Sequence, residues 1–397
     1  MKWLLLVFCT LLELNAQSQS KRIFVYDFDS CFLSEKAGIA GDINNVNPAL
    51  CNCGIEGESI LCANQMLAWP TSFDTLFRDD WTLGFAVRLG NAFGIVDLFS
   101  KQQSCNADTS LSIVFRSQDS TLAVSLREGF DEDLTVYAKL KLTSCWQQLF
   151  ITKNLGQIRI YEDGNLMQEV NTNFLIRLDN KQPLRFNAST CSFQNFTTYK
   201  SLLDNVVIAE YALRRNEILD FYSPQQDIIT EDTLIFLGAS VDLIAQSNCP
   251  VSIQWSPAST LNSSNTLTTL ATPTNTTNYV ARFNDNGCIV IDSILIRVVD
   301  KDKLQCNNLK LPTAFTPNND GINEVFGISN SYLISELKFF DILDRNGGVI
   351  ASFKDANDSW DGSWNGKKLN PSTYFYKISY TCKNDEYYKS GSFYLMK

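Results

Sequence analysis

The stretch that decides the fold class is Gln157-Ile158-Arg159-Ile160-Tyr161-Glu162-Asp163-Gly164-Asn165-Leu166-Met167-Gln168-Glu169-Val170. On both sides of Asp163-Gly164, apolar and polar side chains alternate, which is typical of strands with one buried face. Asp-Gly between two such runs favours a type I′ turn, because that turn needs residues that accept positive φ. The stretch therefore predicts an antiparallel β-hairpin.

Runs of the same kind recur along the chain, with turn residues between them. They are Ile23–Phe28, Trp81–Leu89, Leu111–Arg116, Leu122–Arg127, Leu134–Leu142, Gln147–Lys153 and Leu203–Ala209. Strands at this regular spacing suggest β-sandwiches. The stretch Leu213–Phe221 instead predicts one short helix. We expect an all-β, multidomain protein.

Length and composition exclude several classes of protein. The chain has 397 residues, enough for two or three domains, and its 45% hydrophobic and 19% charged residues are typical of globular chains. The net charge of −10 argues against a nucleic-acid-binding surface, which needs clustered Lys and Arg. The chain contains no histidine, so Ser-His-Asp or Cys-His catalysis and His-ligated metal sites are excluded.

The N-terminus has the pattern of a secretory signal peptide. Lys2 provides the positive charge, and Trp3–Leu12 forms an apolar run too short to span a membrane. We expect cleavage between Ala16 and Gln17, which makes residues 1–16 a signal peptide. No later stretch approaches 18 apolar residues, so we expect no membrane span after signal removal.

An exported chain meets an oxidising compartment, so we expect disulfide bonds. Removal of Cys9 from the twelve cysteines leaves eleven, and this odd number leaves one thiol free or paired between chains. The sequence does not determine the pairing of seven cysteines in the first part of the chain. They are Cys31, Cys51, Cys53, Cys62, Cys105, Cys145 and Cys191.

The C-terminal part carries the most specific motif. It contains Leu311-Pro312-Thr313-Ala314-Phe315-Thr316-Pro317-Asn318-Asn319-Asp320-Gly321-Ile322-Asn323-Glu324-Val325-Phe326, Trp360-Asp361-Gly362 and Tyr374-Phe375-Tyr376-Lys377-Ile378 in this order. Residues 306–397 resemble the gliding-motility-associated C-terminal domain of Bacteroidetes proteins. That resemblance implies a β-sandwich that serves as a type B sorting signal, with the type IX secretion machinery as partner. It also implies a place outside the cell or on its outer surface, reached through the periplasm.

The motif residues also have structural interpretations. Pro317, Asn318, Asn319, Asp320, Gly321 and Asn323 favour turns, as does Asp361-Gly362. The oxygens of Asn318 and Asp320 are weak candidates for binding calcium, but we favour a structural turn and expect that no cofactor is required. Trp360 and Tyr374 are expected in the core, and Cys306 and Cys382 are candidates for a disulfide that joins the ends of the domain.

The first unit, residues 22–224, is similar to laminin-G-like or concanavalin-like lectin sandwiches. The residues that carry this resemblance are Trp81–Val87, Cys145–Thr152, the hairpin Ile158–Leu166 and the closing block Leu203–Leu213. The resemblance implies a jelly-roll sandwich that binds a glycan or a protein, sometimes with calcium. Residues 225–300 resemble a small immunoglobulin-like or polycystic-kidney-disease-like module, which we expect to act as a spacer. In that module we expect a bridge between Cys249 and Cys288, with Trp255 packed against it.

Concanavalin-like folds include glycoside hydrolases, which need two carboxylates at a fixed separation. The acidic cluster Glu128–Asp133 lies between two strand patterns and contains Gly129, so we interpret it as a solvated hairpin loop. Trp69 is a candidate for stacking against a sugar, although core packing is the alternative that we favour.

We expect a non-catalytic surface protein, a glycan- or protein-binding adhesin. The alternatives are a divergent polysaccharide-degrading enzyme on the concanavalin-like domain and a purely structural surface component. The sequence leaves the ligand, the oligomeric state and the choice between release and surface anchoring undetermined.

Overall fold

The computed structural model describes residues 22–36, 43–45, 50–63, 66–89, 94–104, 108–129, 132–141, 145–173, 175–187, 200–224, 226–318 and 320–396. The expected signal peptide, with Ala16 and Gln17, lies outside these residues, as do Cys105, Cys191 and Asn319. The chain divides into two compact units. One comprises residues 1–232, 240–272 and 278–295, and the other comprises residues 233–239, 273–277 and 296–397.

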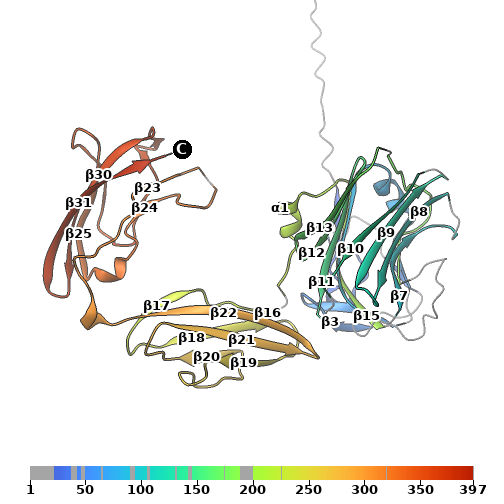
Figure 1. The fold of residues 1–397 in the computed structure, drawn as a ribbon, viewed down its shortest axis with the longest axis horizontal. Coiled ribbons are helices and arrows are strands. Elements are labelled where there is room, and N and C mark those ends of the chain that lie inside the picture. Colours follow the sequence, from blue (N-terminus) through green and yellow to red (C-terminus); the bar gives the residue numbers. More distant parts are fainter. Residues whose placement is uncertain are drawn as a thin grey trace, which may run out of the picture. The chain divides into compact units, whose positions relative to one another are not determined.

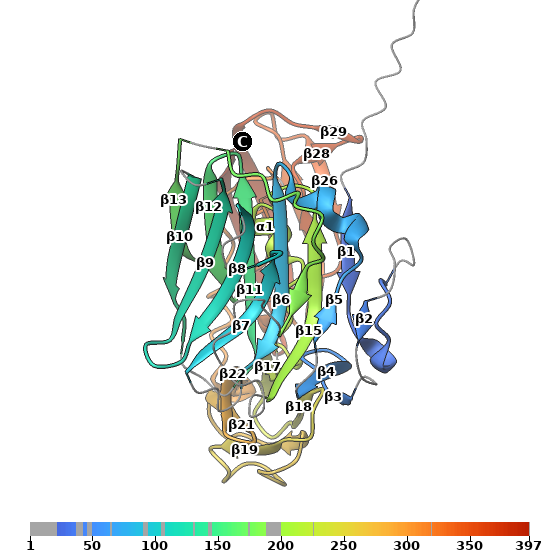
Figure 2. The same ribbon diagram turned by 90° about the vertical axis from the view of Figure 1, so that its right-hand side faces the viewer.

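The first unit begins with a sandwich of two sheets (Figures 1 and 2). Seven strands of the 8-stranded sheet lie in the order β13 (Asn165–Asn171), β12 (Gln157–Glu162), β11 (Gln147–Asn154), β6 (Trp81–Arg88), β15 (Lys200–Ala209), β4 (Glu58–Ala63), β3 (Cys51–Cys53), and β1 (Ile23–Tyr26) also pairs with β15. The 7-stranded sheet has the order β10 (Glu132–Lys139), β9 (Thr121–Glu128), β8 (Thr109–Arg116), β7 (Ile95–Lys101), β14 (Arg185–Phe186), β5 (Leu67–Ala68), β2 (Asn44–Asn45).

The predicted hairpin is present as β12 and β13. Asp163 and Gly164 have φ values of 49° and 72°, the positive values that a type I′ turn requires. The predicted helix is shorter than expected, because α1 covers only Arg215–Leu219. Its Ile218 packs against Phe150 and Tyr161 on the outer face of the 8-stranded sheet. Short 3₁₀ segments η1 (Asp29–Cys31) and η2 (Thr71–Phe77) connect the N-terminal strands.

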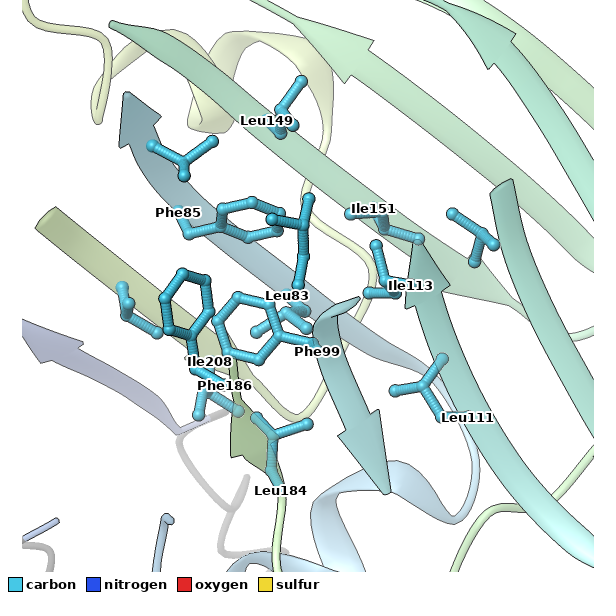
Figure 3. Close-up of a cluster of buried hydrophobic side chains, with 14 of the residues drawn as sticks. Leu83, Phe85, Phe99, Leu111, Ile113, Leu149, Ile151, Leu184, Phe186 and Ile208 are labelled. Atoms are coloured by element: carbon cyan, nitrogen blue, oxygen red, sulfur yellow. The ribbon is translucent and has the colours of Figure 1, made fainter. Parts of the chain in front are cut away.

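Side chains from both sheets meet in one hydrophobic core (Figure 3). Leu83 and Phe85 of β6 face Phe99 of β7, and the ring centroids of Phe85 and Phe99 lie 4.8 Å apart. Phe186 lies 5.0 Å from Phe99, and these rings are at most 1% exposed. Cys62 is also fully buried and forms no disulfide, so this thiol is not available for pairing between chains.

A small second module follows the sandwich. One sheet contains β16 (Gln226–Ile228), β18 (Val241–Ser247) and β20 (Thr268–Ala271), and the other contains β17 (Thr233–Phe236), β22 (Cys288–Val299), β21 (Thr277–Asp285) and β19 (Ser252–Ser256). Its polar middle, residues 256–278, therefore contributes a strand and turns. The buried Trp255 donates a hydrogen bond from Nε1 to the carbonyl oxygen of Thr266, 3.0 Å away.

The expected bridge between Cys249 and Cys288 is wrong. Cys249 pairs with Cys53 of β3, and Cys288 pairs with Cys145, which precedes β11. Both disulfides therefore join the second module to the N-terminal sandwich. The immunoglobulin pattern suggested an internal bridge, but Cys249 lies outside the strands and reaches the loop after β3 instead. Cys31 and Cys51 form a third disulfide, within the sandwich.

A buried ion pair accompanies these two disulfides. Arg88, the last residue of β6, places Nη1 2.5 Å from Oδ2 of Asp285 in β21 and also donates from Nη2 to the Asp285 carbonyl oxygen. The two side chains are only 13% and 6% exposed. Charges taken out of water need such a partner, because an uncompensated buried charge is strongly destabilising.

The second unit contains the C-terminal sandwich. Its main sheet has the order β23 (Ala314–Phe315), β31 (Asp385–Leu395), β30 (Ser372–Cys382), β25 (Glu336–Leu343), β26 (Val349–Phe353). Two small ladders complete it, β24 (Phe326–Gly327) with β27 (Ser359–Trp360) and β28 (Ser363–Trp364) with β29 (Lys367–Lys368). The 3₁₀ segments are η4 (Lys301–Lys303) and η5 (Ser331–Leu333). Cys306 and Cys382 form a disulfide in this domain.

Replacement of Asp285 by Ala is expected to lower the free energy of unfolding by about 3–5 kcal/mol, because Arg88 would remain buried without its carboxylate. The measurement is urea unfolding of the oxidised protein. The control is Arg127→Ala, which removes a pair with Asp133 whose side chains are 38% and 46% exposed and should cost about 1 kcal/mol or less. Equal costs for the two variants would contradict the buried character of the Arg88 pair.

Candidate functional site

The outer face of β8, β9 and β10 is the part of the N-terminal sandwich that we consider for binding. Leu111, Ile113 and Phe115 of β8 point into the core, so the residues between them point away from it. The same alternation holds for β9 and β10. The outward residues are Ser110, Ser112, Val114, Arg116, Thr121, Ala123, Ser125, Arg127, Asp133, Thr135, Tyr137 and Lys139.

Tyr137 and Arg116 form the centre of this face. Tyr137 lies on β10, the edge strand of the sheet, and is 51% exposed. The guanidinium carbon of Arg116 lies 5.4 Å from the centroid of the Tyr137 ring, which is a cation–π contact. In the register of the sheet, Ala123 lies opposite both Val114 and Tyr137. The aromatic ring therefore stands beside small aliphatic residues.

A row of hydroxyl groups runs next to this aromatic contact. Ser125 lies opposite Ser112 on one side and Thr135 on the other, and the hydroxyl oxygens of Ser125 and Thr135 are 2.9 Å apart. Hydroxyl groups donate and accept hydrogen bonds. An amphipathic ring, neighbouring hydroxyls and a guanidinium together suit a polar ligand that also has an apolar face.

The sequence analysis did not single out Tyr137 or Arg116. Alternation in the run from Leu134 to Leu142 does place Tyr137 on the face opposite Val136 and Ala138. That signal marks Tyr137 as outward-facing, but it does not show that Arg116 lies next to it. Their contact depends on the pairing of β8 and β10 with β9, which the sequence does not specify.

Trp69, the expected sugar-stacking candidate, lies in the core. It is only 1% exposed and packs against Phe99, with the ring centroids 5.6 Å apart, and against Tyr26 at 6.0 Å. The stacking hypothesis for Trp69 is therefore wrong, and the core alternative is right. The short strand β5 directs this side chain between the sheets.

The acidic stretch Glu128–Asp133 belongs to the hairpin between β9 and β10, and residues 130 and 131 lie outside the described part. Asp133 pairs with Arg127, 2.5 Å away. Oε2 of Glu128 accepts a hydrogen bond, 2.5 Å long, from the backbone N–H of Arg177. These carboxylates have hydrogen-bonding partners within the sandwich.

Asp204 of β15 has the most perturbed carboxyl group among the described residues. It is fully buried, and it accepts backbone N–H groups of Ile55 (2.9 Å) and Asn205 (2.8 Å). Burial raises its pKa to about 8, with a smaller contribution from the charge of Asp29 and opposition from the backbone hydrogen bonds. These N–H donors give the carboxyl group a structural role, that of holding the loop after β3.

The loop of the C-terminal motif is held by its own hydrogen bonds. Asp320 accepts the backbone N–H of Ile322 at Oδ1 (2.8 Å) and the Asn318 side-chain amide at Oδ2 (3.0 Å). The bond from Ile322 is the main cause that lowers the pKa of Asp320. Gly321 and Asn323 have φ values of 82° and 55°. These contacts hold the turn that Pro317 begins.

Trp360 and Tyr374 lie in the core of the C-terminal domain. Trp360 is 3% exposed, and its ring centroid lies 5.2 Å from that of Tyr374 and 5.7 Å from that of Phe315. Its Nε1 donates to the carbonyl oxygen of Ser363, 2.7 Å away, across the turn formed by Asp361 and Gly362. A Cβ on Gly362 would lie 2.9 Å from a Leu395 methyl carbon, so the turn packs closely on the core.

Comparison with known proteins assigns this domain. Residues 309–395 match CHU_C, the Type IX secretion signal domain. The protein is therefore exported to the cell surface or the extracellular space, and the C-terminal domain interacts with the secretion machinery. No curated protein sequence matches the chain. Among the described residues, no helix has the length and apolar character needed to cross a membrane.

Solved structures similar to the chain include domain 4 of AbnA, a GH43 extracellular arabinanase from Geobacillus stearothermophilus, in complex with arabinotriose. The identity is 16%, the TM-score is 0.43, and 51% of this chain and 98% of that chain are covered. The binding domain of botulinum neurotoxin serotype C1 is 10% identical with a TM-score of 0.43. That match covers 95% of this chain and 94% of the neurotoxin domain. The CBM40 of the Ruminococcus gnavus IT-sialidase, bound to α2,3-sialyllactose, is 10% identical with a TM-score of 0.33. That match covers 37% of this chain and 85% of the CBM40 chain.

Asp204→Asn is expected to reduce the loss of stability as the pH rises from about 4 to about 8. The folded-state pKa of about 8 exceeds the ordinary aspartate pKa of 3.8, so the neutral carboxyl favours the folded state at acidic pH. This contribution is lost progressively between these two values and is gone above the folded-state pKa. The measurement is the Tm of each protein between about pH 5 and 9 at one ionic strength. The wild-type Tm should fall more steeply over this range than that of the variant. The amide has one acceptor oxygen, so the variant starts from a lower Tm, and parallel profiles would contradict the assignment.

Trp360→Ala is expected to destabilise the sorting domain by about 3–5 kcal/mol, because it leaves a large cavity in an aromatic core. The variant should accumulate in the periplasm, as should a chain that lacks residues 306–397. The matched control is Trp364→Ala, since Trp364 is 48% exposed in the same domain. Cell fractionation and limited proteolysis provide the measurement. Normal surface delivery of a Trp360→Ala chain whose domain is protease-sensitive would contradict recognition of the folded domain.

Proposed function

We propose that the protein is a non-catalytic adhesin that binds a glycan at the outer face of β8, β9 and β10. The observation that carries this proposal is the half-exposed ring of Tyr137, which Arg116 contacts and which stands beside a row of hydroxyl groups. A sugar ring has an apolar face that packs on an aromatic ring and hydroxyl groups that bind Ser, Thr and Arg side chains. The exposed sheet face offers both kinds of contact.

The position of this face also supports the proposal. Type IX export delivers the sandwich outside the cell, where a glycan of another surface is accessible. The second module is joined to the sandwich through Cys53–Cys249 and Cys145–Cys288, so it serves as a covalently attached support. The C-terminal domain delivers the chain, and the sandwich binds the ligand.

A polysaccharide-degrading enzyme is the competing function, and it needs a proton donor and a second carboxylate about 5–10 Å apart. The outward residues of β8, β9 and β10 carry hydroxyls, three cations and one carboxylate, that of Asp133, which pairs with Arg127. This composition supports binding without hydrolysis. We propose further that binding requires no cofactor and that calcium does not change it.

Tyr137→Ala is expected to weaken glycan binding about tenfold or more, because the stacking surface is removed while the fold is retained. The measurement is binding of the full mature chain to an array of neutral and acidic oligosaccharides, with calcium chloride or with EDTA. The control is Tyr222→Ala, since Tyr222 is a 42% exposed tyrosine elsewhere on the sandwich.

If the wild type binds a glycan and Tyr137→Ala binds it equally well, the proposed position of the site at Tyr137 is contradicted. Absence of binding to every glycan would contradict the function and favour a purely structural surface protein. Release of reducing ends from an array oligosaccharide by the wild type would favour the hydrolase.

A further inference from the structure

We propose that the sugar bound at this face carries a carboxylate group and that Arg116 binds this group. The inference rests on the proposed glycan-binding function and adds the chemical class of the ligand. It is argued from the charges around Arg116, from its orientation relative to Tyr137 and from the row of hydroxyls next to it.

Arg116 differs from most arginines of the N-terminal sandwich. Six of them have a carboxylate oxygen within 4.0 Å, namely Arg22, Arg78, Arg88, Arg127, Arg159 and Arg177. Arg116 is exposed and has no carboxylate at that distance among the described residues. In a chain with a net charge of −10, acidic groups are abundant. The open guanidinium of Arg116 therefore leaves a local positive charge at the candidate site.

The cation–π contact with Tyr137 restricts the guanidinium, whose carbon lies over the aromatic ring, 5.4 Å from its centroid. A guanidinium presents its N–H groups in a planar fork. Two of these N–H groups match the two oxygens of a carboxylate, which gives a charge-assisted, bidentate interaction. A stacked arginine also loses less side-chain freedom on binding than one that is mobile in solvent.

A second cation lies on the same row of the sheet. Thr121 of β9 is opposite Arg116 on one side and Lys139 on the other, which places two strand spacings, about 10 Å, between their backbones. Two acidic residues lie nearby, Asp119 in the turn before Thr121 and Asp97 of β7, which faces Val114 and already has an interaction partner. Neither forms an ion pair with Arg116.

The dimensions of the face fit one monosaccharide. The hydroxyl row of Ser112, Ser125 and Thr135 lies two residues along the strands from Val114, Ala123 and Tyr137, or about 6.6 Å. A pyranose ring packed beside Tyr137 can direct its carboxylate toward Arg116 and its hydroxyls toward this row. Hexuronic acids and nonulosonic acids both carry a carboxylate and hydroxyl groups on a pyranose ring. The experiment distinguishes these two classes of sugar.

The test compares each acidic sugar with its neutral methyl ester. The probes are an oligogalacturonate and 3′-sialyllactose, each used as the free acid and as the ester, titrated into the full mature chain. We expect the wild type to bind at least one acid about tenfold or more tightly than its ester, and Arg116→Gln to lose this preference. Arg116→Lys keeps the positive charge but lacks the two parallel N–H groups of the guanidinium. It should therefore keep part of the preference for the acid over the ester.

Arg127→Gln is the matched control, because Arg127 lies on the same face but is already paired with Asp133. This variant should keep the preference of the wild type. The wild type could bind acid and ester equally while Tyr137→Ala still weakens glycan binding. That result would overturn the carboxylate inference and leave the proposed function intact. An acid preference that Arg116→Gln does not change would also overturn it. No binding of any glycan would instead overturn the proposed function.

Discussion

The buried carboxyl group of Asp204 positions the loop through which the N-terminal sandwich is linked to the module that follows it. Asp204 lies on β15, a strand inside the 8-stranded sheet, and accepts the N–H of Ile55 in the loop after β3. A Cβ on Gly54 would lie 2.3 Å from the Asp204 oxygen, so only glycine fits at this position. Cys53, next to Gly54, pairs with Cys249 of the second module, and Asn248 donates to the carbonyl oxygen of Ile55. One buried acid thus positions the loop that carries the covalent link.

This linkage changes the role of the second module. The two bridging disulfides join cysteines 196 and 143 residues apart, and Arg88 pairs with Asp285 in the same unit. A simple spacer would need only the chain connection near residue 225. These two disulfides and the buried ion pair connect the modules at three points, which suits the proposed adhesin because force on a bound ligand would pass through them.

The sequence predicted features that depend on neighbouring residues. Alternation predicted the strands, and Asp163-Gly164 predicted the hairpin turn, because both follow from local backbone preferences. It failed where partners lie far apart in the chain. Cys249 and Cys288 fit an internal bridge by their spacing, but each is closer in space to a cysteine of the sandwich. Trp69 and Tyr137 are both large aromatics; alternation along its strand marks Tyr137 as outward-facing, whereas the burial of Trp69 follows from the packing of the two sheets.

The candidate site is a case in which local charge outweighs net charge. The chain as a whole has a charge of −10, which alone would disfavour an acidic ligand. Salt screens exposed charges over about 10 Å at 0.1 M ionic strength, so most of the acidic residues act weakly on a sugar at Tyr137. A guanidinium in direct contact is screened far less, and its two parallel N–H groups recognise a carboxylate by shape as well as by charge. This is why we propose that Arg116, next to the Tyr137 ring, selects a ligand with a carboxylate at this face.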